Sequence, residues 1–180
     1  MPVAWVSAGP SVHSPSPITR CTQGQHWRWD GVQFAVLHPQ AQSAGESDNN
    51  SSCVLRVSAV GGSALLLGDI EKPAERALVA AGLIQPSEIV VAAHHGSRSS
   101  STGELIDAAQ VAGRPQWVVF STGYRNRWNF PREEVVAGWQ GIAAKPVNTA
   151  DSGAVTFYVR PQAIELSAYR TQQPRYWQAR

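Results

Sequence analysis

Two stretches of the chain decide its expected fold: residues 64–69 read ALLLGD, and residues 89–97 read IVVAAHHGS. Each begins as a short, uniformly apolar run and ends abruptly in polar residues. Runs of this length and character are typical of strands that are covered on both faces of a sheet. We therefore expect two buried strands, each of which delivers a polar cluster to one end of a sheet.

Helices and further strands surround these two runs. Pro73 suits the first turn of a helix, and Ser101 with Glu104 has capping-box spacing. Asp30-Gly31 and Gly61-Gly62 each mark a hairpin turn between two apolar runs. The expected strands cover residues 27–29, 32–37, 53–60, 63–67, 89–93, 117–121, 154–160 and 162–168, and the expected helices cover residues 73–82, 102–112 and 132–140.

The chain has the size and composition of one folded domain. Of its 180 residues, 43% are hydrophobic and 16% are charged, which is typical of a folded rather than a disordered protein. A net charge of +2 is too small to indicate a nucleic-acid partner by itself. No stretch has the roughly 20 apolar residues of a spanning helix, and no signal peptide is visible. We divide the chain into a lead-in loop (1–22), one domain (23–168) and a basic aromatic tail (169–180).

The two cysteines, Cys21 and Cys53, are too few and too far apart for a cysteine-rich zinc motif. They fit either two buried thiols or one disulfide. The disulfide would require an oxidising compartment.

Polar residues at the ends of the apolar runs form the candidate site. Asp69 follows the most apolar strand, where a carboxylate can bind or bridge metal ions; the alternative is that it only caps the next helix. On an extended chain His94 and His95 point in different directions, so one reaches a metal while the other supports it or binds a phosphate. Gly96 permits a sharp turn, and the hydroxyls from Ser97 onward lie near a helix N-terminus that favours anions. The plainer alternative is a serine-rich loop with two solvated histidines.

A basic aromatic loop forms a third cluster. Residues 124–129 read YRNRWN, and such arginines and aromatics suit contacts to phosphates and stacking on unpaired bases. The alternative is an exposed basic loop without a ligand. The stretch DNNSS at 48–52 fits a turn better than a ligand site.

Four segments, taken in order, resemble the β-lactamase-like domain of ComEC-type DNA-uptake proteins: NSSCVLR at 50–56, LLLGDIE at 65–71, HHGS at 94–97 and GYRNR at 123–127. Each has modest specificity, whereas the ordered set within residues 23–159 is specific. The resemblance implies an α+β fold, a metallo-β-lactamase-like four-layer αββα sandwich with two divalent metals (zinc or manganese), of which this chain holds the second half only. It also implies a soluble segment of a bacterial inner-membrane protein, on the periplasmic side, whose partners are DNA and the rest of a membrane-embedded channel.

The resemblance also assigns roles by position. Asp69 becomes a metal-bridging carboxylate and His95 a metal ligand, with His94 beside it as a further metal-site residue. Asp69 and His95 are then the catalytic pair. The residues expected to contact nucleic acid are Ser97, Arg125, Arg127 and Trp128.

The sequence departs from the family pattern in one respect that decides its activity. Such hydrolases carry a His-x-His-x-Asp-His motif in their first half, and His13, His26 and His38 do not form it. A later histidine is also absent where Asn129 and Phe130 stand. Because a catalytic zinc needs about three protein ligands, we expect this chain alone to bind metal weakly or not at all and to be inactive. The missing half should also leave one sheet face uncovered, as an apolar surface prone to self-association.

Three functions therefore compete. The first is a metal-dependent phosphodiesterase, a nuclease-like domain of a competence channel that is incomplete in this chain. The second is a non-catalytic module for single-stranded DNA, which uses the basic loop and the tail residues Arg170, Arg175, Tyr176, Trp177 and Arg180. The third is a serine hydrolase that uses a hydroxyl of residues 97–101; it is disfavoured because no nucleophile elbow or orienting acid is evident.

Overall fold

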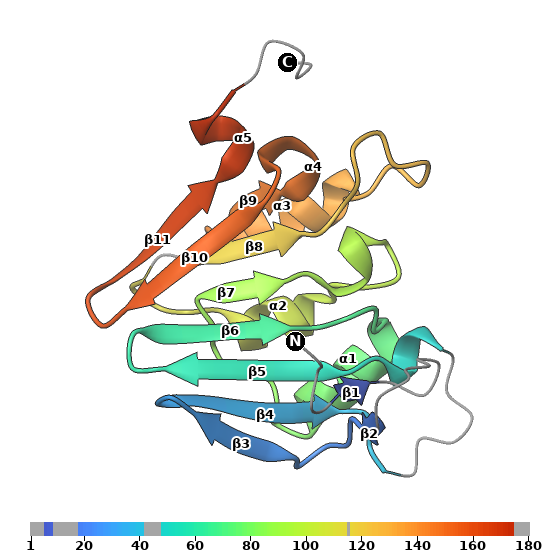
Figure 1. The fold of residues 1–180 in the computed structure, drawn as a ribbon. Coiled ribbons are helices and arrows are strands. Elements are labelled where there is room, and N and C mark those ends of the chain that lie inside the picture. Colours follow the sequence, from blue (N-terminus) through green and yellow to red (C-terminus); the bar gives the residue numbers. More distant parts are fainter. Residues whose placement is uncertain (1–5, 9–17, 42–47, 115, 175–180) are drawn as a thin grey trace.

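The computed structural model describes residues 6–8, 18–41, 48–114 and 116–174. Within them, seven strands form one mixed sheet (Figure 1). In spatial order these strands are β3 (His26–Trp29), β4 (Val32–His38), β5 (Val54–Ala59), β6 (Gly62–Leu66), β7 (Ile89–Val91), β8 (Trp117–Phe120) and β9 (Lys145–Asn148).

The direction of the strands changes at β6. Strands β3 to β6 pair antiparallel, as two successive hairpins joined by the β4–β5 pairing, whereas β6 to β9 pair parallel. The first hairpin turns at Asp30-Gly31, as the sequence predicts, and the second at Val60-Gly61, one residue earlier than expected. Because parallel strands place their carboxyl ends along one edge, the segments that follow β6, β7 and β8 meet there.

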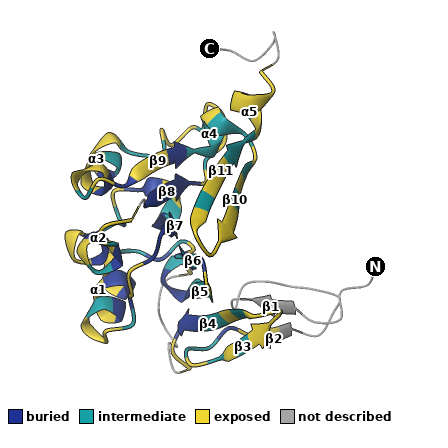
Figure 2. Cartoon of the chain, turned by 90° about the vertical axis from the view of Figure 1, so that its left-hand side faces the viewer, coloured by how far each residue is buried: buried dark blue, intermediate teal, exposed yellow. Residues whose placement is uncertain are grey.

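Three helices cover one face of this sheet (Figure 2). They are α1 (Lys72–Ala80), α2 (Gly103–Ala109) and α3 (Glu133–Gly141), and Pro73 lies in the first turn of α1 as predicted. Their apolar sides and the strands enclose the main core. Its fully buried large side chains include Leu65, Leu67, Val90, Leu105, Val118, Phe120 and Trp139.

An antiparallel hairpin of β10 (Val155–Arg160) and β11 (Ala163–Ala168) lies on the opposite face (Figure 2). Phe157 packs edge-on against Trp117, with ring centroids 5.8 Å apart. Ile164 and Val155 join the same smaller core, which includes Val119 and other residues of β7 to β9. This part of the second face is therefore covered.

The β3–β4 part of the second face exposes aromatic side chains. Trp27 stacks on its cross-strand partner Phe34 with ring centroids 4.9 Å apart. Trp29 is 73% exposed, and these three rings line an open hollow of about 720 Å³. The face that was expected to be uncovered is therefore covered in part by β10 and β11, and exposed aromatic surface is found over β3 and β4.

The two ends of the chain differ from expectation. The lead-in, predicted to be a loop, contains two short parallel strands, β1 (Val6–Ala8) and β2 (Ile18–Arg20). The tail begins with a helical turn, α5 (Tyr169–Gln172), and its residues Arg175, Tyr176, Trp177 and Arg180 lie outside the described residues. Cys21 and Cys53 form a disulfide, which selects one of the two alternatives left open by the sequence.

The fold class is α+β, as predicted. The described residues form a sheet covered by helices on one face and by a hairpin over part of the other, and they do not themselves make a four-layer sandwich. The short turns η1 (Asn49–Ser51), η2 (Ala93–Gly96) and α4 (Thr149–Ser152) complete the described helices. None of these helices has the length and apolar character needed to cross a membrane.

Candidate metal-binding edge of the sheet

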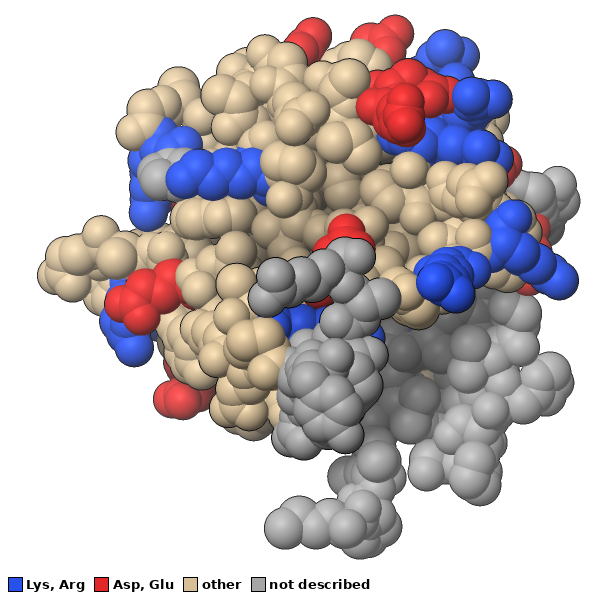
Figure 3. Space-filling model, turned by 90° about the horizontal axis from the view of Figure 1, so that it is seen from above, with Lys and Arg blue, Asp and Glu red and all other residues tan. Residues whose placement is uncertain are grey.

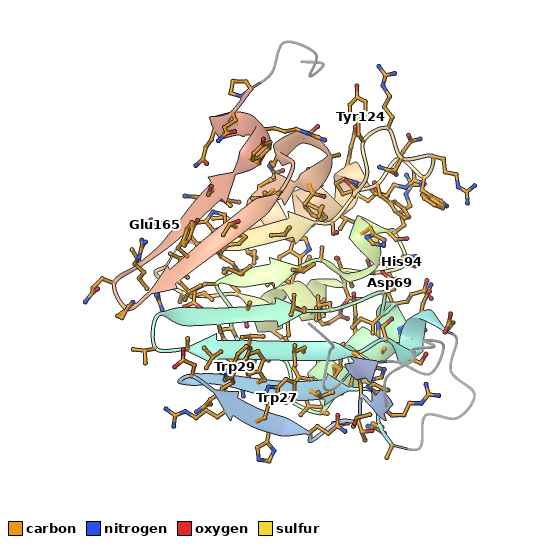
Figure 4. All side chains as sticks on the ribbon, in the orientation of Figure 1. Trp27, Trp29, Asp69, His94, Tyr124 and Glu165 are labelled. Carbon is orange, nitrogen blue, oxygen red and sulfur yellow. A yellow bond between two sulfur atoms is a disulfide. The ribbon has the colours of Figure 1, made fainter. Side chains whose placement is uncertain are left out.

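The candidate site lies where β6, β7 and β8 end. Residues 68–71 follow β6, the turn η2 follows β7, and residues 121–131 follow β8. Figure 4 shows Asp69 and His94 close together at this edge, with Tyr124 on the neighbouring loop. The parallel arrangement of three strands thus gathers all three polar clusters that the sequence singles out.

Asp69 and His95 face each other across this edge. The Nε2 atom of His95 lies 3.4 Å from Oδ1 of Asp69, and both side chains are nearly half exposed. The other ring nitrogen, Nδ1, lies 2.7 Å from the main-chain oxygen of Ser121. Because a carbonyl oxygen can only accept a hydrogen bond, Nδ1 carries a proton. In the neutral imidazole, Nε2 therefore presents its lone pair toward the carboxylate, an arrangement that favours a shared proton or cation.

His94 forms a second pair with an acidic residue. Its Nδ1 lies 3.3 Å from Oε1 of Glu71 and 3.1 Å from the hydroxyl of Ser99. With Nδ1 engaged, Nε2 is the nitrogen through which His94 can bind a ligand. A carboxylate behind one ring nitrogen is also the usual support of a metal-binding histidine.

The backbone of the two histidines differs from the extended chain assumed from the sequence. Both adopt left-handed conformations, with φ values of 46° for His94 and 56° for His95. Such values are uncommon for residues other than glycine and cost free energy, and they cluster at functional sites. The tight turn η2, rather than strand alternation, sets the directions of the two rings.

Gly96 ends this turn and packs against β8 and the segment that follows it. Its φ is +84°, and a β-carbon there would lie 2.6 Å from Cβ of Pro131 and 2.8 Å from Cδ1 of Phe120. Its carbonyl oxygen accepts a hydrogen bond from the amide of Arg132 at 3.0 Å. Only glycine therefore permits the close approach of the histidine turn to residues 130–132, as the sequence anticipates for this position.

The serines after the turn support it from within. Ser97 is buried, and its hydroxyl lies 3.0 Å from that of Ser99. Ser100 donates to the carbonyl oxygens of Ala93 and Ser97 at 2.9 and 3.0 Å. Ser97, which we expect to contact nucleic acid, is 9% exposed, and its hydroxyl lies next to Ser99, the serine that contacts His94.

The helix after these serines is capped one residue later than expected. The side chain of Thr102, not Ser101, accepts the hydrogen bond from the Leu105 amide. The amide of Ser101 instead donates to Glu75 at 2.6 Å. The capping alternative for Asp69 is also wrong, because Glu71 occupies the N-cap position of α1.

The basic loop stacks its aromatic and cationic side chains in pairs. The guanidinium of Arg127 lies 4.4 Å from the Trp128 ring, and that of Arg125 lies 5.2 Å from the Tyr124 ring. Trp128 stacks on Phe130, and Phe130 meets His94 edge-on at 5.9 Å between ring centroids. A continuous series of rings thus joins the exposed loop to the histidine turn.

The donor set fits part of a metal site. Two ligand atoms that each lie about 2.0–2.2 Å from a tetrahedral zinc are separated by about 3.4 Å, which matches the 3.4 Å between His95 and Asp69. Over residues 6–8, 18–41, 48–114 and 116–174, however, no three metal-ligating side chains converge at one point. The described residues can therefore supply two ligands to a cation, fewer than a closed zinc site requires.

The sequence analysis missed three contributors to this edge. Glu71 lies two residues after Asp69, and this short spacing was the only available signal. Phe130 was noted only as a position without a histidine, yet its ring connects Trp128 with His94. No sequence motif marks the Ser121 carbonyl that orients His95.

On one face of the molecule, the charged side chains of the described residues are divided among several groups (Figure 3). On the face shown in Figure 3, basic and acidic side chains lie in small separate groups. Arg98, for example, pairs with Glu134. Any attraction for a polyanion must therefore depend on local groups such as the loop arginines.

No protein-family model matches the chain. Comparison with individual proteins does find similar sequences. It is 36% identical over 155 residues to "Competence protein ComA" of Neisseria gonorrhoeae, which covers 86% of this chain and 22% of that protein. It is 33% identical over 153 residues to "Recombination protein 2" of Haemophilus influenzae, which covers 85% of this chain and 18% of that protein. The chain is similar to one part of each of these two proteins.

A third relative comes from another bacterium. "ComE operon protein 3" of Bacillus subtilis is 30% identical over 138 residues, which cover 77% of this chain and 17% of that protein. The chain thus spans about a fifth of the length of the curated relatives it matches. The chain is thus similar in sequence to one part of each of these longer proteins.

Proposed function

We propose that the chain is part of a metal-dependent phosphodiesterase domain that acts on DNA in a competence protein. The observation that carries this proposal is the convergence of His95 Nε2 and Asp69 Oδ1 at the carboxyl edge of parallel strands. A metallo-β-lactamase-like sandwich, of which this sheet is one half, is the fold we propose for the intact domain. Partner residues from the other half would add the ligands that this chain lacks.

Each residue has a definite task in this proposal. Asp69 and His95 would hold a divalent cation, zinc or manganese, with His94 beside them. When bound, such a cation polarises a phosphoryl oxygen and stabilises developing negative charge. The Ser121 carbonyl fixes the proton on Nδ1 of His95, so that Nε2 remains a lone-pair donor. Arg125 and Arg127 would neutralise charge on the phosphates of the bound strand.

The disulfide supports a location outside the cytoplasm. Disulfides persist in oxidising compartments such as the bacterial periplasm and are rare in the cytosol. The Cys21–Cys53 bond therefore favours the periplasmic side of the inner membrane for this segment. The relatives' names are consistent with a role in DNA uptake.

A serine hydrolase is disfavoured by the same geometry. In a catalytic triad, the serine and the acid contact different nitrogens of the histidine. Here Ser99 and Glu71 both contact Nδ1 of His94. Ser99 is therefore not placed as a nucleophile with His94 as its base.

Metal titration tests the proposal. We expect zinc and manganese to bind with micromolar or weaker affinity, and Asp69→Asn or His95→Asn to weaken zinc binding at least tenfold. Asparagine is chosen at position 95 because it tolerates the left-handed backbone. The exposed His26, replaced by asparagine, is the matched control and should leave the affinity unchanged.

Two results would count against the proposal. Unchanged zinc affinity in both site variants would remove Asp69 and His95 from the metal site. Sub-micromolar binding of two equivalents by the wild-type chain would show that the site is complete without another half.

A second function, binding of single-stranded DNA without catalysis, is favoured by the ring series from Trp128 to His94. Stacking on exposed aromatics and contacts to arginine are sequence-tolerant ways to hold a single strand. Fluorescence anisotropy with a labelled oligonucleotide should show salt-dependent binding that Arg127→Ala and Trp128→Ala weaken. Arg76→Ala, on an exposed side of α1, is the control for charge alone.

A further inference from the structure

A short segment between β4 and β5 contacts the turn that carries Asp69. It consists of residues 49–53 and is called here the Asn50 strap. Asn50 is only 9% exposed, although its side chain is polar. The sequence alone favours a turn here, and η1 is such a turn.

Asn50 makes two polar contacts, one through its main chain and one through its side chain. Its main-chain oxygen lies 2.6 Å from Nε2 of His38, which is buried at the end of β4. Its side-chain oxygen accepts a hydrogen bond from the amide of Glu71 at 2.9 Å. Because Glu71 is the N-cap residue of α1, this hydrogen bond holds the backbone directly before the first residue of the helix.

The Glu71 side chain extends this connection to the histidine turn. Its carboxylate lies 3.3 Å from Nδ1 of His94. A chain of contacts therefore runs from His38 through Asn50 and Glu71 to His94. Its three links are all formed by polar atoms of buried or half-buried residues.

The strap also packs against Gly68, the residue before Asp69. Gly68 has φ of +60°, and a β-carbon there would lie 2.9 Å from Cβ of Ser52 and 3.1 Å from the oxygen of Cys53. The carbonyl oxygen of Gly68 accepts a hydrogen bond from the amide of His94 at 2.9 Å. The strap thus contacts both residues 68 and 71, which bracket Asp69.

We propose that Asn50 is a positioning residue for this site, because it fixes the turn over residues 68–71 and so sets Asp69 and Glu71 against the two histidines. This inference rests on the proposed function, because the positioned residues would bind the metal. The positioning of residues 68–71 by Asn50 can nevertheless be tested without metal. Supporting residues of this kind typically change metal affinity about 10–100-fold when they are removed.

Amide hydrogen exchange, followed by NMR without metal, tests the positioning itself. Asn50→Ala should accelerate exchange at the Glu71 and His94 amides at least tenfold, whereas Asn49→Ala should not. Asn50→Asp keeps an acceptor oxygen and should restore most of the protection. Asn50→Ser, whose side chain is too short to keep the contact, should behave like Asn50→Ala and serves if that variant does not fold.

Zinc titration of the same variants tests the consequence. Zinc affinity should fall about tenfold or more in Asn50→Ala and Asn50→Ser, and should stay within threefold of wild type in Asn50→Asp and Asn49→Ala. Wild-type exchange in the alanine and serine variants would overturn the inference even if the protein binds zinc. Failure of the wild-type chain to bind zinc or manganese would instead count against the proposed function and leave the exchange result to decide the role of Asn50.

Discussion

The carboxylate of Glu75 accepts a hydrogen bond from the main-chain amide of Thr102 at 2.8 Å, and its second oxygen accepts one from Ser101 at 2.6 Å. Glu75 lies on α1 and has no solvent exposure. It therefore joins α1 to the segment that leads from the histidine turn into α2. Burial raises the pKa of this carboxyl, while the two amides oppose that rise.

Stability should depend on pH through Glu75. Because its folded pKa is raised above the unfolded value, the folded chain holds this proton more tightly, and the resulting stability is complete at acidic pH. It is lost as pH rises through the raised pKa. The free energy of unfolding of wild type relative to Glu75→Gln should therefore fall as the pH rises from below the ordinary pKa of a glutamate through the raised pKa of Glu75, as measured by urea unfolding. A difference that is constant or increases with pH would contradict this.

Gly96 should tolerate no side chain. Gly96→Ala places a β-carbon against Pro131 and Phe120 in a left-handed conformation, which should cost about 1–3 kcal/mol of stability. Gly103→Ala is the matched control, because a β-carbon there meets nothing within 4 Å. Equal melting temperatures for the two variants would refute the expected crowding.

The disulfide should contribute substantially to stability. It links residues 32 apart in sequence, and closing a loop of this size stabilises a protein by about 3–4 kcal/mol in the chain-entropy model. Replacing Cys21 and Cys53 together by serine should lower the free energy of unfolding by that order. Added reductant should reproduce the loss in wild type but have no effect on the double variant.

Trp29 should promote self-association. Its ring is 73% exposed beside the stacked Trp27 and Phe34, and exposed apolar surfaces of this kind favour contacts between molecules. Trp29→Ser should reduce the fraction of dimers and larger species in sedimentation velocity. Val60→Ser, at a residue in the β5–β6 turn that is 89% exposed, should leave that fraction unchanged.

Sequence periodicity predicted most of the sheet, because the central strands are continuous apolar runs and the hairpins have strong turn signals. Strand β9 was missed. Its four residues include Pro146 and show no apolar alternation, so only pairing with β8 makes it a strand. The same limit applies to β1 and β2, which are three residues long.

The positions of the site residues were partly predictable. Asp69 and His95 could be placed at one edge because each follows a buried strand, and the structure brings them within 3.4 Å. The orientation of Ser97 and the left-handed histidines could not be predicted, because they depend on close packing of Gly96 against Pro131 and Phe120. Such contacts between distant segments leave no local pattern in the sequence.

The tight packing of Gly96 against Pro131 has a mechanical consequence. With its oxygen bonded to the Arg132 amide and no space beside Pro131, the histidine turn cannot shift without displacing the end of the basic loop. Force applied to the loop by a strand drawn across Trp128 would thus be transmitted to His94 and His95. Under the proposed function, tension on a bound nucleic acid would therefore be coupled through this one glycine to the residues that would hold the cation.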